Sequence, residues 1–439
     1  MKNQFVSTAR GSELARKLWI TIALLAVYRM GVFVPTPGVN AAALGQLITE
    51  GANIFGFFNT FTGGALERFS VFALGIMPYI SSSIIFSLLT AVNENLSRLQ
   101  KEGGDLGRKK INQYTRYGTV LIAIVQGFGI ASWLQSDPGG MQIVENPGVG
   151  FVAMTVVTLT AGTVFIMWLG EQITQRGIGN GTSLIIFASI VASFPAAVGF
   201  LWEQVQLGEL RLEGFFTLAV VAIGMMAFIV FMERAQRRIP IHHAKKVVGR
   251  KMFGASMQFL PLKINMAGVI PPIFAMSILL FPGTLAHFFG ERFPQFANAS
   301  EWFQPGTWIY NSLYAAGIIF FCYFYTAITF NPDDLADNVK KSGGFVPGIR
   351  PGKNTSEFID RVITRLTTAG AVYITLVCIA PFLFFDNFQI FLGGTSILIV
   401  VGVSLNFIEQ IQSHLMAQRY EGFLGASRPK RFSRAGRRG

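Results

Sequence analysis

Few residues of this chain have the types and spacing that a catalytic or metal site requires. The pair His242-His243 lies in a basic stretch with no acidic residue at ligand spacing, so no metal site is expected there. Gly348-Ile349-Arg350-Pro351-Gly352-Lys353 has the wrong spacing for a phosphate-binding loop, and Asn354 follows it instead of Ser or Thr. Cys322 and Cys378 lie in apolar runs and are expected to be packed thiols. The sequence therefore indicates neither an enzyme nor a cofactor-binding protein.

The ionisable residues within apolar stretches fall near the ends of those stretches. They are Arg29, Glu171, Asp386 and Glu409. Side chains at such positions can extend to the membrane surface, whereas proton- and ion-driven transporters usually keep charged groups near the bilayer centre. An apolar, uncharged centre favours a channel whose energy is supplied by another protein.

The composition indicates that the elements carrying these residues lie in a membrane. Of 439 residues, 51% are hydrophobic and 13% are charged, against about 25% charged in soluble domains. A helix needs about 20 apolar residues to cross the bilayer, and backbone groups in lipid must be paired within the segment. The sequence predicts an all-α polytopic protein with ten membrane-spanning helices near 20–36, 71–92, 117–135, 151–170, 182–201, 214–232, 266–286, 309–330, 366–385 and 391–411.

The basic residues predict which side of the membrane each loop faces. With the N-terminus inside, nearly all of the 36 Lys and Arg residues fall in inner segments, and the outer loops hold only Arg68, Arg211 and Arg292. This bias places both termini in the cytoplasm. No cleavable leader is visible, so residue 1 is expected to belong to the mature chain.

Two short sequence motifs, called the repeated phrases below, each occur twice, about half a chain apart and inside apolar segments. Gly75–Ile80 is echoed by Gly268–Ile273, and Gly181–Ile186 is echoed by Gly394–Ile399. Five helices per half is an odd number, so the second half must begin on the opposite side of the membrane. The repeat is therefore inverted, and breaks at matching Gly and Pro positions indicate the working centre of a transport protein.

The repeats place branched apolar residues at matching positions on four helices. Ile76 and Ile80 are four residues apart and share a helical face, as do Thr182 and Ile186. Ile273 and Ile399 are the echo partners of Ile80 and Ile186. If the four helices surround an axis, these six residues form an apolar constriction. The alternative is that they are ordinary packed or lipid-facing residues.

One apolar segment, residues 54–70, is too short to span the membrane. Gly63-Gly64 and the pair Glu67-Arg68 interrupt it, and it lies on the outer side. Such a segment is either interfacial, which its composition favours, or re-entrant and buried in protein. We call residues 54–70 the short segment.

Two inner loops, 233–265 and 331–365, are long and basic. Part of their charge is the ordinary topology signal. Their length and charge also suit docking of an anionic cytosolic body, such as ribosomal RNA or an acidic motor surface. We predict an N-terminal half over 1–203, a C-terminal half over 204–412 that carries both loops, and a basic cytoplasmic tail over 413–439 whose far end is disordered.

Several long and unusual strings of residues carry a family resemblance. The sequence resembles the bacterial SecY protein-translocation channels over essentially its whole length. The strings are Phe61–Ala65, Ala73–Ile80, Gln113–Gly118, Gly170–Thr174, Gly177–Gly181, Pro261–Lys263, Asn265–Pro271, Asn331-Pro332, Phe345–Gly352 and Gly393–Ser396.

The resemblance implies an hourglass channel in the bacterial cytoplasmic membrane. Its constriction ring would be Ile76, Ile80, Thr182, Ile186, Ile273 and Ile399. A short plug helix near 57–70 would seal it and would include Phe61, Gly63, Gly64, Leu66, Glu67 and Arg68. Helices two and three, opposite seven and eight, would form a lateral gate for signal sequences and nascent membrane segments. Thr182 departs from a fully aliphatic ring, and its hydroxyl is expected to wet the seal slightly or to bond to a carbonyl of its own helix.

The resemblance also implies partners. SecE would clamp the two halves and SecG would lie at the periphery. The SecA motor or the ribosome would bind the inner loops, with contributions from Arg250, Lys251, Lys340, Lys341 and Arg350.

Two other classes of protein are considered beside a polypeptide channel. A secondary transporter for small solutes also uses inverted repeats and broken helices, but the uncharged centre and the large basic loops count against it. An intramembrane enzyme would need a catalytic dyad or metal cluster within the spans, and the sequence shows none.

Overall fold

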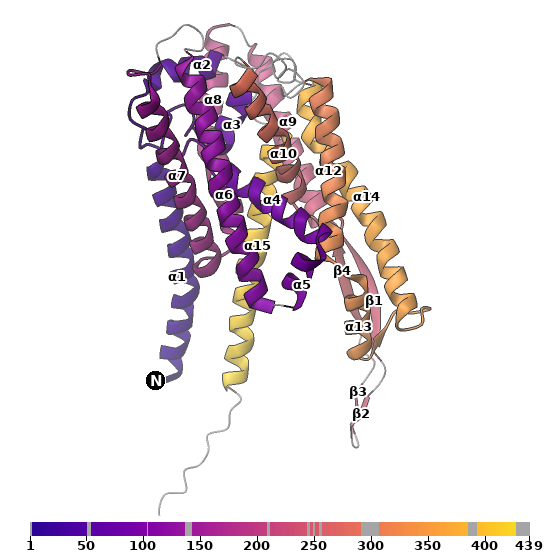
Figure 1. The fold of residues 1–439 in the computed structure, drawn as a ribbon. Coiled ribbons are helices and arrows are strands. Elements are labelled where there is room, and N and C mark those ends of the chain that lie inside the picture. Colours follow the sequence, from indigo (N-terminus) through magenta and orange to yellow (C-terminus); the bar gives the residue numbers. More distant parts are fainter. Residues whose placement is uncertain are drawn as a thin grey trace, which may run out of the picture.

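Long helices run side by side through most of the molecule (Figure 1). The structure is a computed structural model that describes residues 2–50, 54–102, 104–136, 143–208, 211–243, 246–248, 251–253, 257–290, 307–384 and 393–426. Each of the ten predicted spans falls on a helix, so the prediction of a polytopic helical membrane protein is confirmed. These helices are α1 (Lys2–Gly31), α4 (Met77–Val92), α6 (Gly104–Gln135), α7 (Val149–Arg176), α8 (Gly181–Gln206), α9 (Leu212–Arg234), α10 (Ile270–Gly290), α12 (Trp308–Thr329), α14 (Lys353–Phe384) and α15 (Gly394–Ala426).

Two of the predicted spans begin before the helices that occupy them, since α4 starts at Met77 and α10 at Ile270. Within the described part of the chain, α6, α7, α8, α9, α12, α14 and α15 are long and apolar enough to cross a membrane, whereas the apolar stretches of α4 and α10 are shorter. The predicted spans 71–92 and 266–286 therefore begin too early. The chain enters each of them in a non-helical conformation before the helix starts.

The helix starts agree with the repeated phrases. Gly75 and Gly268 both have positive φ, +56° and +66°, a conformation that glycine adopts without strain. In each case the helix begins two residues later, at Met77 and at Ile270, and a proline follows at the second position. Proline suits a helix start because the N–H that it lacks would have no helical partner there.

The second pair of phrases marks two close helix crossings. Gly181 is the first residue of α8, and a Cβ there would collide with the carbonyl oxygen of Gly170 on α7. Gly394 is the first residue of α15, and a Cβ there would collide with the carbonyl oxygen of Val377 on α14. Helices α7 and α14 are each the fourth of a five-helix half, so the two inverted halves repeat the same backbone contact.

The inner loops contain structure that the prediction did not include. Strand β1 (Gln236–His243) lies between β4 (Met257–Lys263) and β5 (Gly344–Phe345) in an antiparallel sheet, and β2 (Lys246–Val248) pairs with β3 (Lys251–Phe253). Helix α13 (Pro332–Lys341) precedes β5, and residues 353–365 of the predicted second loop belong to α14. A small hydrophobic core that includes Ile239, Leu262, Ala336 and Ile359 joins these pieces.

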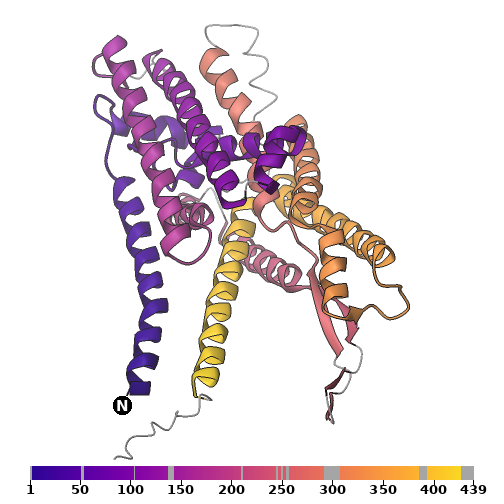
Figure 2. The same ribbon diagram turned by 60° about the horizontal axis from the view of Figure 1, so that its bottom comes forward.

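The start of α1, the end of α15 and the described parts of the inner loops lie at one end of the bundle. Figures 1 and 2 show the start of α1, the end of α15, α13 and strands β1–β4 at the same end of the molecule. The short helices α2 (Ala41–Glu50) and α3 (Ile54–Thr62) lie toward the opposite end, and α5 (Glu94–Glu102) connects α4 to α6. The described parts of the basic loops therefore lie at the same end of the molecule as the start of α1 and the end of α15.

Candidate functional site

The six predicted ring residues lie at the beginnings of four helices. Ile76 caps α4 and Ile80 lies in its first turn, while Thr182 and Ile186 occupy the first two turns of α8. Ile273 lies in the first turn of α10, and Ile399 in the second turn of α15. The ring positions are therefore fixed by where each helix starts.

The five isoleucines are buried together. Each is at most 5% exposed, and all five belong to one hydrophobic cluster. Helix α4 contacts α10 and helix α8 contacts α15, so the two helices of each repeated pair touch across the halves. Thr182 is only half-buried and is the exception.

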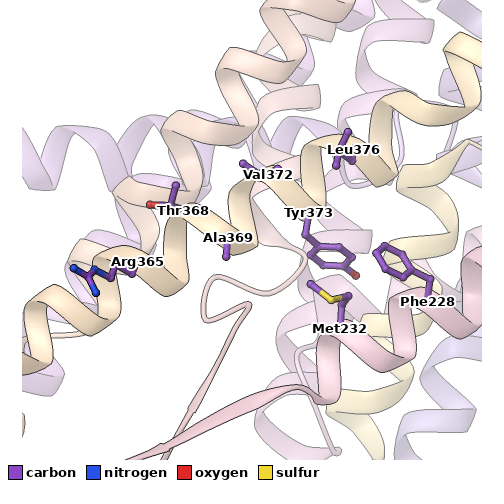
Figure 3. Close-up of a pocket in the computed structure, with 8 residues that line it drawn as sticks. All are labelled: Phe228, Met232, Arg365, Thr368, Ala369, Val372, Tyr373 and Leu376. Atoms are coloured by element: carbon purple, nitrogen blue, oxygen red, sulfur yellow. The ribbon is translucent and has the colours of Figure 1, made fainter.

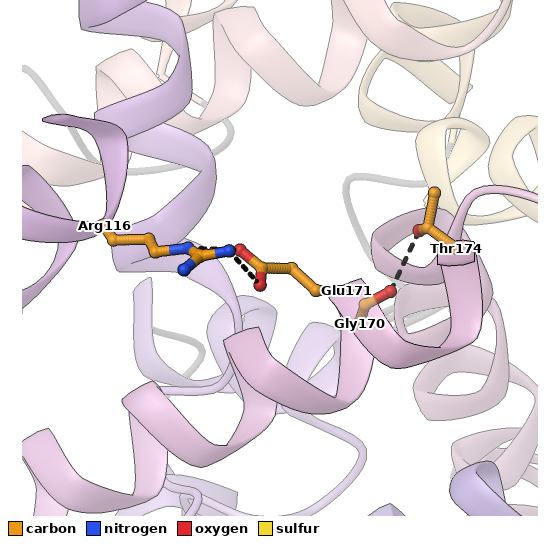
Figure 4. A network of polar contacts seen from close by, with 4 residues as sticks. All are labelled: Arg116, Gly170, Glu171 and Thr174. Carbon is orange, nitrogen blue, oxygen red and sulfur yellow. Dashed lines mark hydrogen bonds and ion pairs between the residues drawn. The ribbon is translucent and has the colours of Figure 1, made fainter. Parts of the chain in front are cut away.

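Polar side chains fix the start of α8. Asn180 is the N-cap, and its side-chain oxygen accepts from Thr182 N at 3.1 Å and from Thr182 Oγ1 at 2.7 Å. The Thr182 hydroxyl therefore bonds to the cap and not to a carbonyl of its own helix. Thr174 Oγ1 donates to Gly170 O at 2.9 Å (Figure 4) and accepts from Gly181 N at 2.8 Å. This network ties the end of α7 to the beginning of α8.

The starts of α10 and α15 are fixed by residues that the sequence analysis did not single out. Asn265 Oδ1 accepts from Gly268 N at 2.9 Å, and Asn265 Nδ2 donates to Gly268 O at 3.1 Å and to Glu233 Oε1 at 2.6 Å. Tyr314 and Thr395 share a hydrogen bond of 3.0 Å at the start of α15. The sequence signal for the Asn265–Gly268 contact was an asparagine three residues before a glycine.

The short segment is buried inside the protein. Phe58, Phe61, Leu66 and Phe69 are at most 6% exposed and belong to the same hydrophobic cluster as the ring isoleucines. Helix α3 contacts α8 from one half and α10 from the other. The structure therefore favours the re-entrant alternative over the interfacial one.

The short segment folds back on itself after α3. Gly63 and Gly64 have positive φ, +69° and +84°, and reverse the chain. Asn59 Nδ2 donates to Glu67 Oε2 at 3.2 Å, and Glu67 N donates to Asn59 Oδ1 at 3.1 Å. Arg68 is exposed, and its guanidinium lies 4.4 Å from the centre of the Phe33 ring.

The ionisable residues at the span ends are bonded instead of extending freely to the membrane surface. Arg116 of α6 makes two hydrogen bonds to Glu171 of α7, at 2.8 and 2.7 Å (Figure 4), and Lys263 Nζ lies 2.7 Å from both oxygens of Glu409. Arg29 Nη1 donates to Gly63 O at 2.7 Å. Asp386 lies outside the described residues.

The basic residues of the inner loops come from separate elements. Lys340 and Lys341 end α13 and are exposed, and Arg350 is exposed between β5 and α14. Lys251 begins β3, and Arg250 lies outside the described residues.

Neither the thiols nor the described pocket lies at a reactive centre. Cys322 and Cys378 are buried free thiols, as predicted, and within the described ranges no three His, Cys, Asp or Glu residues gather as metal ligands. A groove of about 630 Å³ opens between α9 and α14, with Arg365 near one end and Phe228 facing Tyr373 (Figure 3). Since neither α9 nor α14 carries a ring position, this groove is separate from the constriction.

The fold and this site define a class of polytopic membrane protein. Two inverted five-helix halves meet where four helices begin, and a re-entrant segment lies against the apolar cluster formed there. The SecY family profile matches residues 70–408. The chain belongs to the SecY family.

Comparison with individual proteins agrees with this assignment. The protein translocase subunit SecY of Vibrio cholerae serotype O1 is 51% identical over 431 residues, covering 96% of each chain. A solved channel, described as having a plug domain that stabilises its closed state and maintains a membrane seal, has a TM-score of 0.67 at 18% identity and covers 93% of this chain and 94% of its own. Sec61 from the canine ribosome–channel complex has a TM-score of 0.64 at 17% identity, with coverage of 93% and 94%.

Proposed function

We infer that this chain is a protein-conducting channel, the pore subunit of a translocase, and that the buried ring isoleucines close its pore. The observation that carries the inference is their shared burial at the starts of four helices from two inverted halves. Family membership supports the same activity, since the Vibrio relative is a protein translocase subunit. The chain is a channel subunit and not an enzyme.

A ring of branched apolar side chains suits a pore for polypeptides. Water leaves a narrow apolar constriction, so ions cannot pass, while aliphatic side chains make no specific bond to any one peptide. Ile76, Ile80, Ile186, Ile273 and Ile399 would supply this seal, and Thr182 would be its one polar member.

The short segment is proposed as the plug. Its buried side chains, its position against α8 and α10 and its reversal at Gly63 support this role. Phe61 and Leu66 would pack against the ring, whereas Glu67 and Arg68 lie toward the less buried side. The related channel with a described plug domain supports the same assignment.

The route into the membrane is proposed to open between α4 and α6 on one side and α10 and α12 on the other. Both α4 and α6 contact α10 in this structure. The gate would therefore be closed here, in agreement with the buried ring and the seated short segment. Opening would separate α10 from both helices and let signal sequences and membrane segments reach lipid.

The partners and location follow from the charge distribution and the family. SecE, SecG, the SecA motor and the ribosome are the proposed partners, with contributions to docking from Arg250, Lys251, Lys340, Lys341 and Arg350 of the inner loops. The canine Sec61 neighbour is described in a complex with a ribosome. We place the chain in the bacterial cytoplasmic membrane with both termini inside, and we keep the division into 1–203, 204–412 and 413–439.

A small-solute transporter is not favoured. Such proteins bind substrate and coupling ion at the midplane, with polar or charged groups at broken helices. In the described part of this chain, the corresponding helix starts carry the isoleucine cluster instead.

Photocrosslinking from positions 80, 186, 273 and 399 to an arrested secretory chain tests the pore assignment. Crosslinks at all four positions, lost when the signal sequence is disabled, are expected if the polypeptide passes through the ring. Absence of crosslinks in a stable, intact complex would indicate that these residues only pack the helices together. A small-solute transporter would then have to be reconsidered.

Deletion of residues 60–70 tests the plug assignment. The channel should still export protein but conduct ions at rest, because the segment that fills the entrance is gone. Resting conductance equal to that of the unmodified channel would count against the assignment.

A further inference from the structure

Two adjacent residues of α1 bond to the backbone of the short segment. Arg29 Nη1 donates to Gly63 O at 2.7 Å, and Tyr28 OH lies 3.3 Å from Thr62 O. Tyr28 OH also lies 2.6 Å from Ser189 Oγ on α8. The turn at Thr62-Gly63 is therefore connected to α1 and α8 at one point.

Gly63 is required by this close approach. A Cβ at Gly63 would lie 3.0 Å from Arg29 Nη1 and 3.1 Å from Ser189 Cα, and the residue has positive φ. The turn is thus held between α1 and α8 with no room for a side chain. Both hydrogen bonds from α1 to the short segment end on backbone carbonyls, so apart from Gly63 they require no particular side chain in that segment.

Arg29 has an unusual environment for a half-buried cation. Among the residues described, no carboxylate lies within ion-pair distance of it. Its guanidinium lies 5.5 Å from the Phe33 ring, which Arg68 also approaches. The Gly63 carbonyl is consequently its principal hydrogen-bond acceptor, and a bond from a charged donor is stronger than one between neutral groups.

The two hydroxyl groups can pair in two ways. Ser189 Oγ lies 2.9 Å from Ile185 O and 2.6 Å from Tyr28 OH. With the short segment seated, Ser189 can donate to Tyr28 while Tyr28 donates to Thr62 O. If the segment leaves, Tyr28 can donate to Ser189 while Ser189 donates to Ile185 O. Neither hydroxyl loses a partner for its proton, so this part of the contact can open without leaving a buried donor unpaired.

We propose that Arg29 and Tyr28 form a latch that holds the short segment in its closed position through the Gly63 and Thr62 carbonyls. This proposal rests on the plug assignment above. Arg29 supplies most of the holding energy, and the Tyr28–Ser189 pair allows release. Both act as positioning residues, because neither belongs to the isoleucine ring.

The resting ion leak of the channel complex in lipid vesicles reports how firmly the latch holds the short segment closed. Arg29→Gln should raise the leak about tenfold, as expected for loss of one charge-assisted hydrogen bond. Arg29→Lys should restore much of the seal because it keeps a cationic donor. Arg211→Gln, which removes an exposed arginine before α9, is the matched control and should not change the leak. A leak in Arg29→Gln no greater than in this control would overturn the latch.

Two further comparisons separate a latch from a general loss of structure. In a channel that lacks residues 60–70, Arg29→Gln should add no further leak, whereas an equal additional leak would indicate damage elsewhere. If that deletion does not leak by itself, the plug assignment fails instead of the latch.

Ser189→Ala is expected to lower the resting ion leak, whereas Arg29→Gln raises it. Without Ser189, Tyr28 has a partner for its proton only when the short segment is seated, so the leak of the Arg29→Gln channel should fall. An increase would contradict the two pairing arrangements, and melting temperatures of the purified complexes would identify a variant that is simply unfolded.

Discussion

A ring isoleucine differs from other isoleucines in this chain by its surroundings and not by its type. Ile186 is 4% exposed within the central cluster, whereas Ile223 of α9 is 66% exposed on the outer surface. The same side chain therefore packs at the constriction in one case and faces outward in the other. The proposed role of Ile186 therefore depends on its burial in this cluster.

A polar substitution distinguishes these two positions. Ile186→Ser should increase resting ion conductance severalfold, because a hydroxyl keeps water in a constriction that otherwise stays dry. Ile223→Ser, the matched control, should leave conductance unchanged. Single-channel or vesicle-flux recordings of both variants make the comparison, and equal conductance in the two would argue against a seal at Ile186.

At the scale of whole elements, glycine sets how closely the helices cross. The first residues of α8 and α15 lie directly against carbonyl oxygens of α7 and α14. Any side chain at these positions must push the helix start away from its neighbour. Since Ile186 and Ile399 lie within two turns of these starts, the crossings also set the ring geometry.

Gly394→Ala should destabilise the protein by about 1–3 kcal/mol, the usual cost of overpacking a tight contact. Gly199→Ala is the control, because nothing lies within 4 Å of a Cβ there and alanine is the better helix former. Thermal unfolding in detergent should show a lower midpoint for Gly394→Ala only. Similar midpoints for the two variants would mean that the crossing can relax.

The sequence predicted these elements better than it predicted their contacts. Apolar length located ten helices, whereas the repeated motifs, which the sequence analysis placed inside the spans, lie at the starts of four helices. Hydropathy alone placed the starts of α4 and α10 several residues too early, because a non-helical entry buried in protein is as apolar as a helix. The alternating Ile239 and Ile241 could have indicated strand β1. The sequence analysis missed this signal because the strand is short and rich in basic residues.

The contacts of Arg29 could not be predicted from residue types. Its acceptor is the Gly63 carbonyl, and a backbone carbonyl has no sequence signature. Tyr28 and Ser189 are likewise distant in the chain and meet only after α1 and α8 pack. Position near a span end suggested extension to the membrane surface, whereas the fold supplied a partner.

The whole molecule is electrically asymmetric along its long axis. The chain carries a formal net charge of +13, and exposed Lys340 and Lys341 at the end of α13, with Arg350 between β5 and α14, lie at the end of the molecule where α1 starts and α15 ends. The β4–β1–β5 sheet and α13 give these charges a folded support. A large anionic partner would therefore meet a fixed surface at this end.

Reversal of these charges should weaken such docking. Arg350→Glu combined with Lys340→Glu should lower the affinity for salt-washed ribosomes about tenfold or more, and the dependence of affinity on salt should become shallower because fewer phosphate contacts form. Sedimentation binding at several salt concentrations measures both quantities. Arg211→Glu, away from the basic loops, is the control, and an equal loss there would indicate a nonspecific charge effect.

The four helix starts also have a consequence for ion selectivity. The first N–H groups of a helix have no helical acceptor, and each N-terminus behaves as roughly half a positive charge. Helices α4, α8, α10 and α15 all begin beside the same apolar cluster. Once water enters an opened constriction, these dipoles should favour halide ions over potassium. Under a potassium chloride gradient, the reversal potential of a leaky variant should therefore lie toward the chloride equilibrium potential.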